Sequence, residues 1–262
     1  MKQEFCKDPS NWVVWFDLDD TVWDFSANSL ETLDEVYAHF ELDRFWTDAQ
    51  QWKKDYHAIN DALWDVFAEN KITSAELRFH RFYDTFTKKG VAETEAREMA
   101  LAADSFYLSR LAERERLVEG ARDLLKYLKT RGFQLGILSN GFKDVQHKKL
   151  ISGKILDFFN FIVLSDDAGI TKPDERIFRY AESIARSRPD RCIMIGDNLK
   201  TDIMGAVNAY WPFAFRLDRK KECQPDVFSC KKPSEAVCKT PDKEKYTYIY
   251  TVQSLIEIKS LL

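Results

Sequence analysis

The chain has 262 residues, of which 45% are hydrophobic and 31% charged, a composition typical of a packed globular protein rather than a disordered one. Its formal net charge of −4 offers no electrostatic basis for binding a nucleic acid polymer or an anionic membrane. No apolar stretch approaches the roughly 20 residues that a membrane span needs, and the N-terminus lacks the apolar core of a secretion signal, so we expect a cytoplasmic protein.

The first predicted element is the apolar run at 12–16, Trp-Val-Val-Trp-Phe, which leads directly into Asp17, Asp19, Asp20 and Thr21. Such a run is typical of a strand that is buried on both faces of a parallel sheet. Because acidic residues disfavour strands, this strand should end near Asp17 and leave the carboxylates at its carboxyl end, where open α/β sheets bind ligands. The alternative is an ordinary acidic turn in which Asp19 or Asp20 caps a helix.

Residues 23–113 change to a helical pattern, with four predicted helices and no convincing strand. Thr73 and Glu76 fit a capping box at the start of the third helix, and Gly90 ends that helix. The fourth helix is predicted from Ala96 to Leu111. We interpret this stretch as an α-helical insertion whose Trp and Phe residues form its own core.

From residue 120 onwards, helices alternate with short apolar strands. Helices are predicted at 121–130, 143–151, 175–185, 202–208 and 252–262, and strands at 134–138, 161–164, 191–195, 213–217 and 246–250. This alternation predicts a mostly parallel, doubly wound sheet with right-handed crossovers. The expected fold class is therefore α/β, with a Rossmann-like core from 1–22 and 114–262 and an inserted helical domain at 23–113.

Residues 218–245 interrupt the alternation, because they are rich in Lys, Pro and Cys and have little periodicity. We predict a long surface loop or a small excursion. Three cysteines, Cys223, Cys230 and Cys238, lie in it, and a local disulfide is an option under oxidising conditions. The total of five cysteines is odd and contains no Cys-x-x-Cys pair, which argues against a disulfide framework and a zinc site. Cys192 lies in an apolar run and is expected in the core.

Polar groups follow three of the predicted strands, and a fourth group lies in the loop before a predicted helix. They are Asp17 with Asp19, Ser139 with Asn140, Asp197 with Asp202, and Lys172. The carboxyl ends of parallel strands meet at one edge of a sheet, so these groups should converge there. Taken singly, each has an ordinary alternative as a turn, an exposed loop lysine or a helix N-cap.

This constellation resembles the haloacid dehalogenase superfamily of phosphohydrolases over nearly the whole chain. Its four motifs are matched by Asp17-Leu18-Asp19-Asp20-Thr21, by Ser139, by Lys172-Pro173, and by Gly196-Asp197 with Asp202. One departure is Asp20, which stands where the first motif usually has glycine. The helical insertion resembles the family's C1-type cap. Residues 55–64, 72–74 and 139–142 resemble the pyrimidine nucleoside 5′-monophosphatases of the house-cleaning type.

The resemblance implies a phosphatase in which Asp17 is the nucleophile and forms an aspartyl-phosphate intermediate. Asp19 would protonate the leaving alkoxide and then deprotonate the attacking water. Side chains alternate along an extended segment, so residues two apart can project into the same cavity. Lys172, Ser139 and the backbone N–H groups near Asn140 would bind the phosphoryl oxygens.

The same resemblance implies Mg²⁺ as cofactor, held by the carboxylates of Asp17 and Asp197 and by the backbone carbonyl of Asp19. Asp202 would lie behind these ligands and orient a metal-bound water or Lys172, and Thr21 would also support the site from behind.

The core motifs do not determine the leaving group, so several functions remain open beside a nucleoside 5′-monophosphatase. The substrate could be a sugar phosphate or another small phosphometabolite, and a phosphomutase or a catalytically silent binding protein is also possible. A dehalogenase is disfavoured, because its chemistry does not need the acid/base Asp19. We expect a small phosphate ester as substrate, neither a nucleic acid polymer nor a membrane as partner, and a monomer or homodimer.

Overall fold

The computed structural model describes residues 8–69, 71–219, 235–239 and 246–262. The chain forms two compact units, which divide between Asp24 and Phe25 and between Glu115 and Arg116. We call residues 25–115 the helical unit and the remaining described residues the α/β unit. The boundaries expected from the sequence, at 22/23 and 113/114, lie two residues from these divisions.

The α/β unit is built on a seven-stranded sheet with the order β3-β2-β1-β4-β5-β7-β6. Its strands are β1 (Val13–Phe16), β2 (Gln134–Ser139), β3 (Phe161–Leu164), β4 (Cys192–Gly196), β5 (Phe213–Leu217), β6 (Glu235–Lys239) and β7 (Tyr246–Val252). All neighbours are parallel except β6, which pairs antiparallel with β7. The predicted α/β class with a mostly parallel sheet is confirmed.

The strand β1 lies at the centre of this sheet, with Phe16 paired to Ile137 of β2 on one side and to Ile195 of β4 on the other. The strand order reverses at β1, because β2 and β3 extend in one direction while β4 and β5 extend in the other. Such a switch point leaves a crevice at the carboxyl ends of the strands, where doubly wound sheets bind ligands.

The prediction of a surface loop at 218–245 is wrong for Glu235–Lys239, which form β6. This edge strand obtains its hydrogen-bond partners from β7, and such long-range pairing is not visible in the local composition. Residues 220–234 and 240–245 lie outside the described residues, and so does the predicted disulfide, since it involves Cys223 or Cys230.

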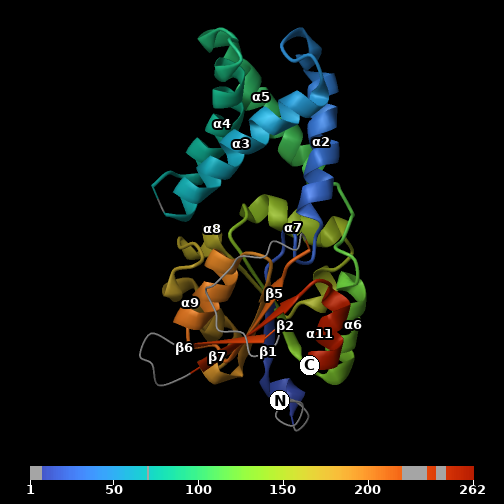
Figure 1. Cartoon of the computed structure of the whole chain (residues 1–262), viewed down its shortest axis with the longest axis vertical. Helices are drawn as coiled ribbons and strands as arrows, with labels where there is room; N and C mark the ends of the chain where they lie inside the picture. The colour runs from blue at the N-terminus through green and yellow to red at the C-terminus, as the bar shows by residue number, and fades with distance from the viewer. Residues whose placement is uncertain (1–7, 70, 220–234, 240–245) are drawn as a thin grey trace. The chain divides into compact units, whose positions relative to one another are not determined.

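Helices cover both faces of the sheet, with α6 and α11 on one side and α9 on the other (Figure 1). Their bounds are α6 (Ala121–Arg131), α7 (Lys143–Ser152), α8 (Ser165–Ala168), α9 (Glu175–Ala185), α10 (Met204–Asn208) and α11 (Leu255–Leu261). Short 3₁₀ turns lie at Pro9–Asn11, Leu156–Phe158 and Pro189–Arg191. A π-helical turn at Leu199–Ile203 precedes α10 and replaces the first part of the helix predicted at 202–208.

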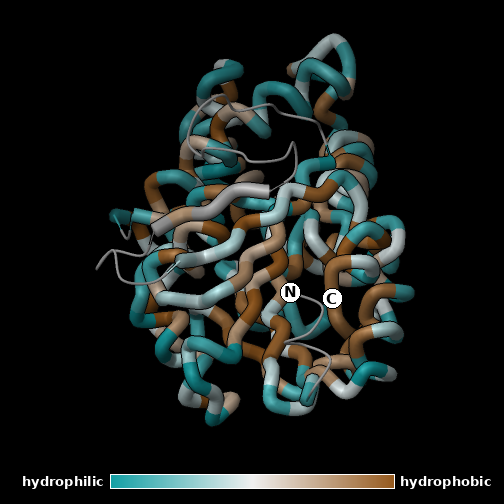
Figure 2. Tube along the Cα trace, turned by 60° about the horizontal axis from the view of Figure 1, so that its bottom comes forward, coloured by the Kyte–Doolittle hydropathy of each residue, from teal (hydrophilic) through white to brown (hydrophobic). Residues whose placement is uncertain are grey.

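The core of the α/β unit forms around Trp15, which is fully buried on β1. Its ring packs against Gly136 of β2, where any side chain would collide with it, and stacks 6.3 Å from the ring of Trp211. Cys192 is also buried, as expected. Figure 2 shows hydrophobic residues concentrated along the central strands and hydrophilic residues on the outer turns. The burial of each large apolar side chain stabilises the fold by about 1.5–3 kcal/mol.

The helical unit contains α2 (Phe25–His39), α3 (Ala49–Ala68), α4 (Ser74–Lys88) and α5 (Glu93–Leu111), with a 3₁₀ turn at Leu42–Arg44. The predicted capping box between Thr73 and Glu76 is present at the start of α4. Trp52, Phe82 and Phe86 are fully buried and stack on one another, so these aromatic residues form the core of the unit as predicted.

Two short stretches of the α/β unit lead to and from the helical unit, and they run side by side in opposite directions. Trp23 and Leu117 form an antiparallel bridge. The N–H of Asp24 donates to the carbonyl of Arg116 at 3.1 Å, and the N–H of Val118 donates to the carbonyl of Val22 at 3.0 Å. The chain therefore leaves and re-enters the α/β unit at adjacent points. None of the helices in the described ranges is long and apolar enough to cross a membrane.

Candidate active site

The first group of the site lies directly after β1, where Asp17 continues the line of the strand. Its N–H donates to the carbonyl of Ile195 at 2.9 Å, so its backbone is fixed against β4, and its side chain is largely buried. Asp20 adopts a left-handed backbone conformation with a φ of 57°. Among residues other than glycine, aspartate and asparagine tolerate this conformation best, which explains how Asp20 can occupy a position usually held by glycine.

A buried lysine links two of the predicted acids. The ammonium of Lys172 donates hydrogen bonds of 2.6 Å to Oδ1 of Asp17 and 2.6 Å to Oδ1 of Asp202. The backbone of Lys172 is itself clamped by Asn140, whose Oδ1 accepts from its N–H at 2.7 Å and whose Nδ2 donates to its carbonyl at 3.0 Å. The side-chain amide of Asn140 therefore positions the lysine loop, and the predicted phosphate contact falls to backbone N–H groups near Asn140.

Three carboxylates form a compact cluster beside this lysine. Each of Asp17, Asp197 and Asp202 places one oxygen within 4.8 Å of the others. Asp202 can approach so closely because Gly196 has no side chain, and a Cβ at that position would collide with the Asp202 carboxylate. Oδ1 of Asp197 lies 3.5 Å from the hydroxyl of Thr21, which is a long contact.

The two oxygens of Asp202 are both engaged, since Oδ1 accepts from Lys172 and Oδ2 accepts from the N–H of Asn198 at 3.1 Å. This arrangement fits the expected role of Asp202 in orienting Lys172. Asp17 and Asp197 have fewer competing donors among the described residues, and they are the better candidates for metal ligands.

Burial raises the pKa of Asp17 from its ordinary value of 3.8 to about 7, with Lys172 opposing this shift and Asp202 and Asp19 adding to it. Burial, followed by the charges of Asp202 and Asp17, also raises the pKa of Asp197 well above its ordinary value. Burial alone would lower the pKa of Lys172, but the two neighbouring carboxylates outweigh it and raise that pKa. Hard oxygen donors that repel one another in this way fit a small divalent cation such as Mg²⁺.

We expect the metal-free protein to lose stability as the pH rises from about 4 to about 7. The folded Asp17 keeps a proton that the unfolded chain releases near pH 3.8, so folding takes up protons and the free energy of unfolding falls with rising pH. Urea titrations with EDTA measure the difference in unfolding free energy between Asp17→Asn and the wild type. This difference should shift in favour of the variant by at least about 1.4 kcal/mol between pH 5 and pH 8, the equivalent of one pKa unit. An equal gap at both pH values would contradict the raised pKa.

The acid/base candidate Asp19 is held by two residues that the sequence interpretation missed. Nζ of Lys149 donates to Oδ1 and Oδ2 of Asp19 at 2.7 and 3.0 Å, and Nε2 of Gln146 donates to Oδ2 at 3.0 Å. Gln146 also donates to the hydroxyl oxygen of Ser139 at 2.7 Å. The available signal was their spacing, because two polar residues three apart on the helix after Ser139-Asn140-Gly141 lie on one face of it.

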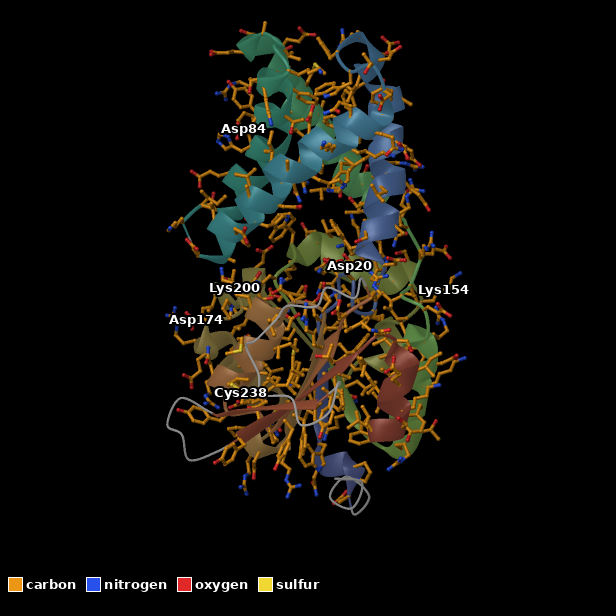
Figure 3. The ribbon with its side chains drawn as sticks, viewed as in Figure 1. Asp20, Asp84, Lys154, Asp174, Lys200 and Cys238 are labelled. Atoms are coloured by element: carbon orange, nitrogen blue, oxygen red, sulfur yellow. The ribbon has the colours of Figure 1, made fainter. Side chains whose placement is uncertain are left out.

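The predicted site residues thus come together at the carboxyl edge of β1, β2 and β4. Lys172 joins Asp17 to Asp202, and Gln146 joins Asp19 to Ser139. Figure 3 shows Asp20 and Lys200, from the turns after β1 and β4, at the same end of the α/β unit. Carboxylates, an ammonium group and a hydroxyl at a topological switch point are suited to a hydrolase that handles an anionic substrate.

The chain belongs to the haloacid dehalogenase-like hydrolase family, whose model matches residues 13–209. It is 29% identical to pyrimidine 5′-nucleotidase YjjG of Escherichia coli, over 75% of this chain and 81% of that protein. It is also 29% identical to pyrimidine 5′-nucleotidase PynA of Streptococcus pneumoniae, over 82% of this chain and 90% of that protein. Both relatives are phosphatases, and the chain is a phosphoric monoester hydrolase of this family.

A solved structure extends this similarity to the fold of nearly the whole chain. The HAD-hydrolase YfnB of Bacillus subtilis, bound to magnesium, superimposes with a TM-score of 0.77 at 26% identity. The match covers 96% of this chain and 98% of that one.

Proposed function

We propose that the protein is a Mg²⁺-dependent phosphatase of nucleoside 5′-monophosphates that works through an aspartyl-phosphate on Asp17. The observation that carries the mechanism is the contact of Lys172 with Asp17 and Asp202 inside a carboxylate cluster at the switch point of the sheet. The similarity to two relatives named pyrimidine 5′-nucleotidase supports the choice of substrate.

In the first half of the reaction, the Asp17 carboxylate attacks the phosphorus and the ester P–O bond breaks. The leaving alkoxide takes a proton from Asp19, so nucleoside departs while phosphate stays on Asp17. In the second half, Asp19 removes a proton from a water molecule, which attacks the same phosphorus. The bond between the phosphorus and the Asp17 oxygen breaks, and inorganic phosphate forms.

The hydroxyl of Ser139 is arranged to donate a hydrogen bond to the transferring phosphoryl group. Its oxygen already accepts from Nε2 of Gln146 at 2.7 Å and from the N–H of Gly141 at 3.2 Å. Both lone pairs are therefore used, and the hydroxyl hydrogen is left to donate to a phosphoryl oxygen. Lys172 supplies the positive charge that offsets the negative charge of the phosphoryl group and of Asp17.

The carboxylates of Asp17 and Asp197, with the backbone carbonyl of Asp19, would hold Mg²⁺. When bound, the ion supplies charge neutralisation and fixes the orientation of the phosphoryl group. We assign the helical unit the role of a cap that admits substrate and restricts water, as the resemblance of residues 23–113 implies.

The test is phosphate release from a panel of nucleoside 5′-monophosphates, sugar phosphates and phosphoglycolate, with Mg²⁺ and with EDTA. We expect nucleotides to be turned over with the highest kcat/KM, and EDTA to remove the activity. Turnover of other phosphate esters alone would retain the mechanism and replace the substrate. If phosphate or nucleotide bound but no ester was cleaved, including an aryl phosphate, the protein would be a binding protein instead.

A further inference from the structure

We propose that Gln146 and Lys149 are positioning residues that orient Asp19 for its acid/base role, an inference that rests on the proposed function. The two side chains project from one face of α7 and donate three hydrogen bonds to the Asp19 carboxylate, two from Lys149 and one from Gln146. A carboxylate on a turn after a strand has freedom about its side-chain torsions, and these contacts restrict it to one orientation.

Lys149 and Gln146 differ from Asp19 in their exposure to solvent. The side chain of Lys149 is 4% exposed, whereas that of Asp19 is 29% exposed. Gln146 is completely buried. The supporting residues are therefore shielded, while the carboxyl group that they hold is accessible, so they act through Asp19 and do not touch the substrate.

The contacts suit both halves of the proposed reaction. An ammonium or amide N–H can donate to a carboxylate oxygen and also to the carbonyl oxygen of a protonated carboxyl group. Lys149 and Gln146 can thus retain Asp19 in the same place before and after it transfers its proton. A misplacement of about 1 Å at a reacting group costs on the order of a hundredfold in rate. The loss of these contacts should therefore be measurable as a loss of rate.

Gly141 leaves space for the side chain of Gln146. A Cβ on Gly141 would collide with the side-chain amide of Gln146. The glycine of Ser139-Asn140-Gly141 therefore leaves room for an amide that links the phosphate-binding hydroxyl of Ser139 to Asp19. The turn and the first two turns of α7 form one connected support for the phosphate-binding Ser139 and the acid/base Asp19.

The competing interpretation is that Lys149 only stabilises the fold, because its ammonium also lies 4.6 Å from the centre of the Trp23 ring. The experiment must therefore separate the loss of an oriented acid from a general loss of activity. The leaving group makes this separation possible. An alkoxide needs a proton to depart, whereas p-nitrophenolate departs without one.

The test compares kcat/KM for the best alkyl phosphate of the panel with kcat/KM for p-nitrophenyl phosphate, in the full chain with Mg²⁺. For Lys149→Met we expect a loss of about a hundredfold on the alkyl ester and of less than about threefold on the aryl ester. Gln146→Met should show the same selectivity with a smaller loss, and it serves as a second variant if Lys149→Met does not fold. Lys148→Met, an exposed neighbour on α7, is the matched control and should behave as wild type on both esters.

Asp19→Asn provides the reference, and the double variant with Lys149→Met measures the coupling. If Lys149 acts through Asp19, the second substitution should cost little once Asp19 is replaced. Equal losses on both esters, full additivity in the double variant, or no loss at all would overturn the positioning role. If Asp19→Asn itself treated the two esters alike, the proposed role of Asp19 would fail, and the role of its two supports with it.

Discussion

Replacing Asp17 with asparagine is expected to lower kcat for every phosphate ester by about 10⁴-fold or more, the size of loss seen when a covalent nucleophile is removed. Asparagine has the same shape as aspartate and still places a polar side chain beside Lys172, but its amide cannot form the acyl-phosphate. Steady-state phosphate release and a quench for covalent ³²P on the protein would measure the two consequences, and both signals should disappear together.

The same variant should be more stable than the wild type in EDTA at about pH 8, because it removes a buried carboxylate whose pKa is raised by its own burial and by the charge of Asp202. Asp190→Asn, at an exposed aspartate that forms an ion pair with the exposed Arg188, is the matched control and should alter neither turnover nor stability appreciably. Residual turnover within tenfold of wild type would contradict Asp17 as the nucleophile.

The second large effect is expected for Lys172→Met. The side chain of Lys172 is 2% exposed and its ammonium contacts both Asp17 and Asp202, so its removal leaves two buried carboxylates without their counter-charge. Breaking a buried ion pair from one side typically costs about 3–5 kcal/mol, and we expect a loss of about 3 kcal/mol of unfolding free energy in EDTA at about pH 8. Turnover should fall by at least about a thousandfold, because a phosphoryl-binding charge is also lost.

The pH dependence of this loss identifies its cause. At about pH 5 the unpaired carboxylates can bind protons, so the destabilisation of Lys172→Met should shrink by more than about 1 kcal/mol. Urea unfolding at the two pH values measures this, with Lys200→Met at an exposed position as the control. A loss that did not depend on pH would indicate that Lys172 contributes by packing and not by charge.

The sequence allowed the sheet and most of the acidic site to be predicted, because both depend on local patterns. The run at 12–16 is buried on both faces, and its composition alone indicates a central strand. Asp17 and Lys172 lie 155 residues apart, and their predicted meeting followed from the rule that parallel strands end at one edge. That rule places backbone positions, and it does not specify which side chains touch.

What could not be predicted depends on side-chain direction and long-range pairing. Gln146 and Lys149 look like ordinary polar residues of a surface helix until α7 is seen to turn that face toward Asp19. In the helical unit, the buried pair of Arg81 with Asp104 has no local signature either. The strand β6 depends on β7 for its hydrogen bonds, and its five residues lie within a Lys-, Pro- and Cys-rich stretch whose composition indicates a loop.

The adjacent crossings at Trp23 and Leu117 have a consequence for how this protein can diversify. Because residues 25–115 begin and end at hydrogen-bonded neighbours, they form a closed excursion whose length hardly strains the sheet. Each doubling of the length of a flexible loop costs only about 0.6 kcal/mol of closure entropy, so the loops that join the helices of this unit can lengthen at low cost. Mutation can therefore rebuild residues 25–115, to which we assign the role of a cap, while the carboxylates at the edge of the sheet stay in place, and one inherited reaction can be redirected to new metabolites.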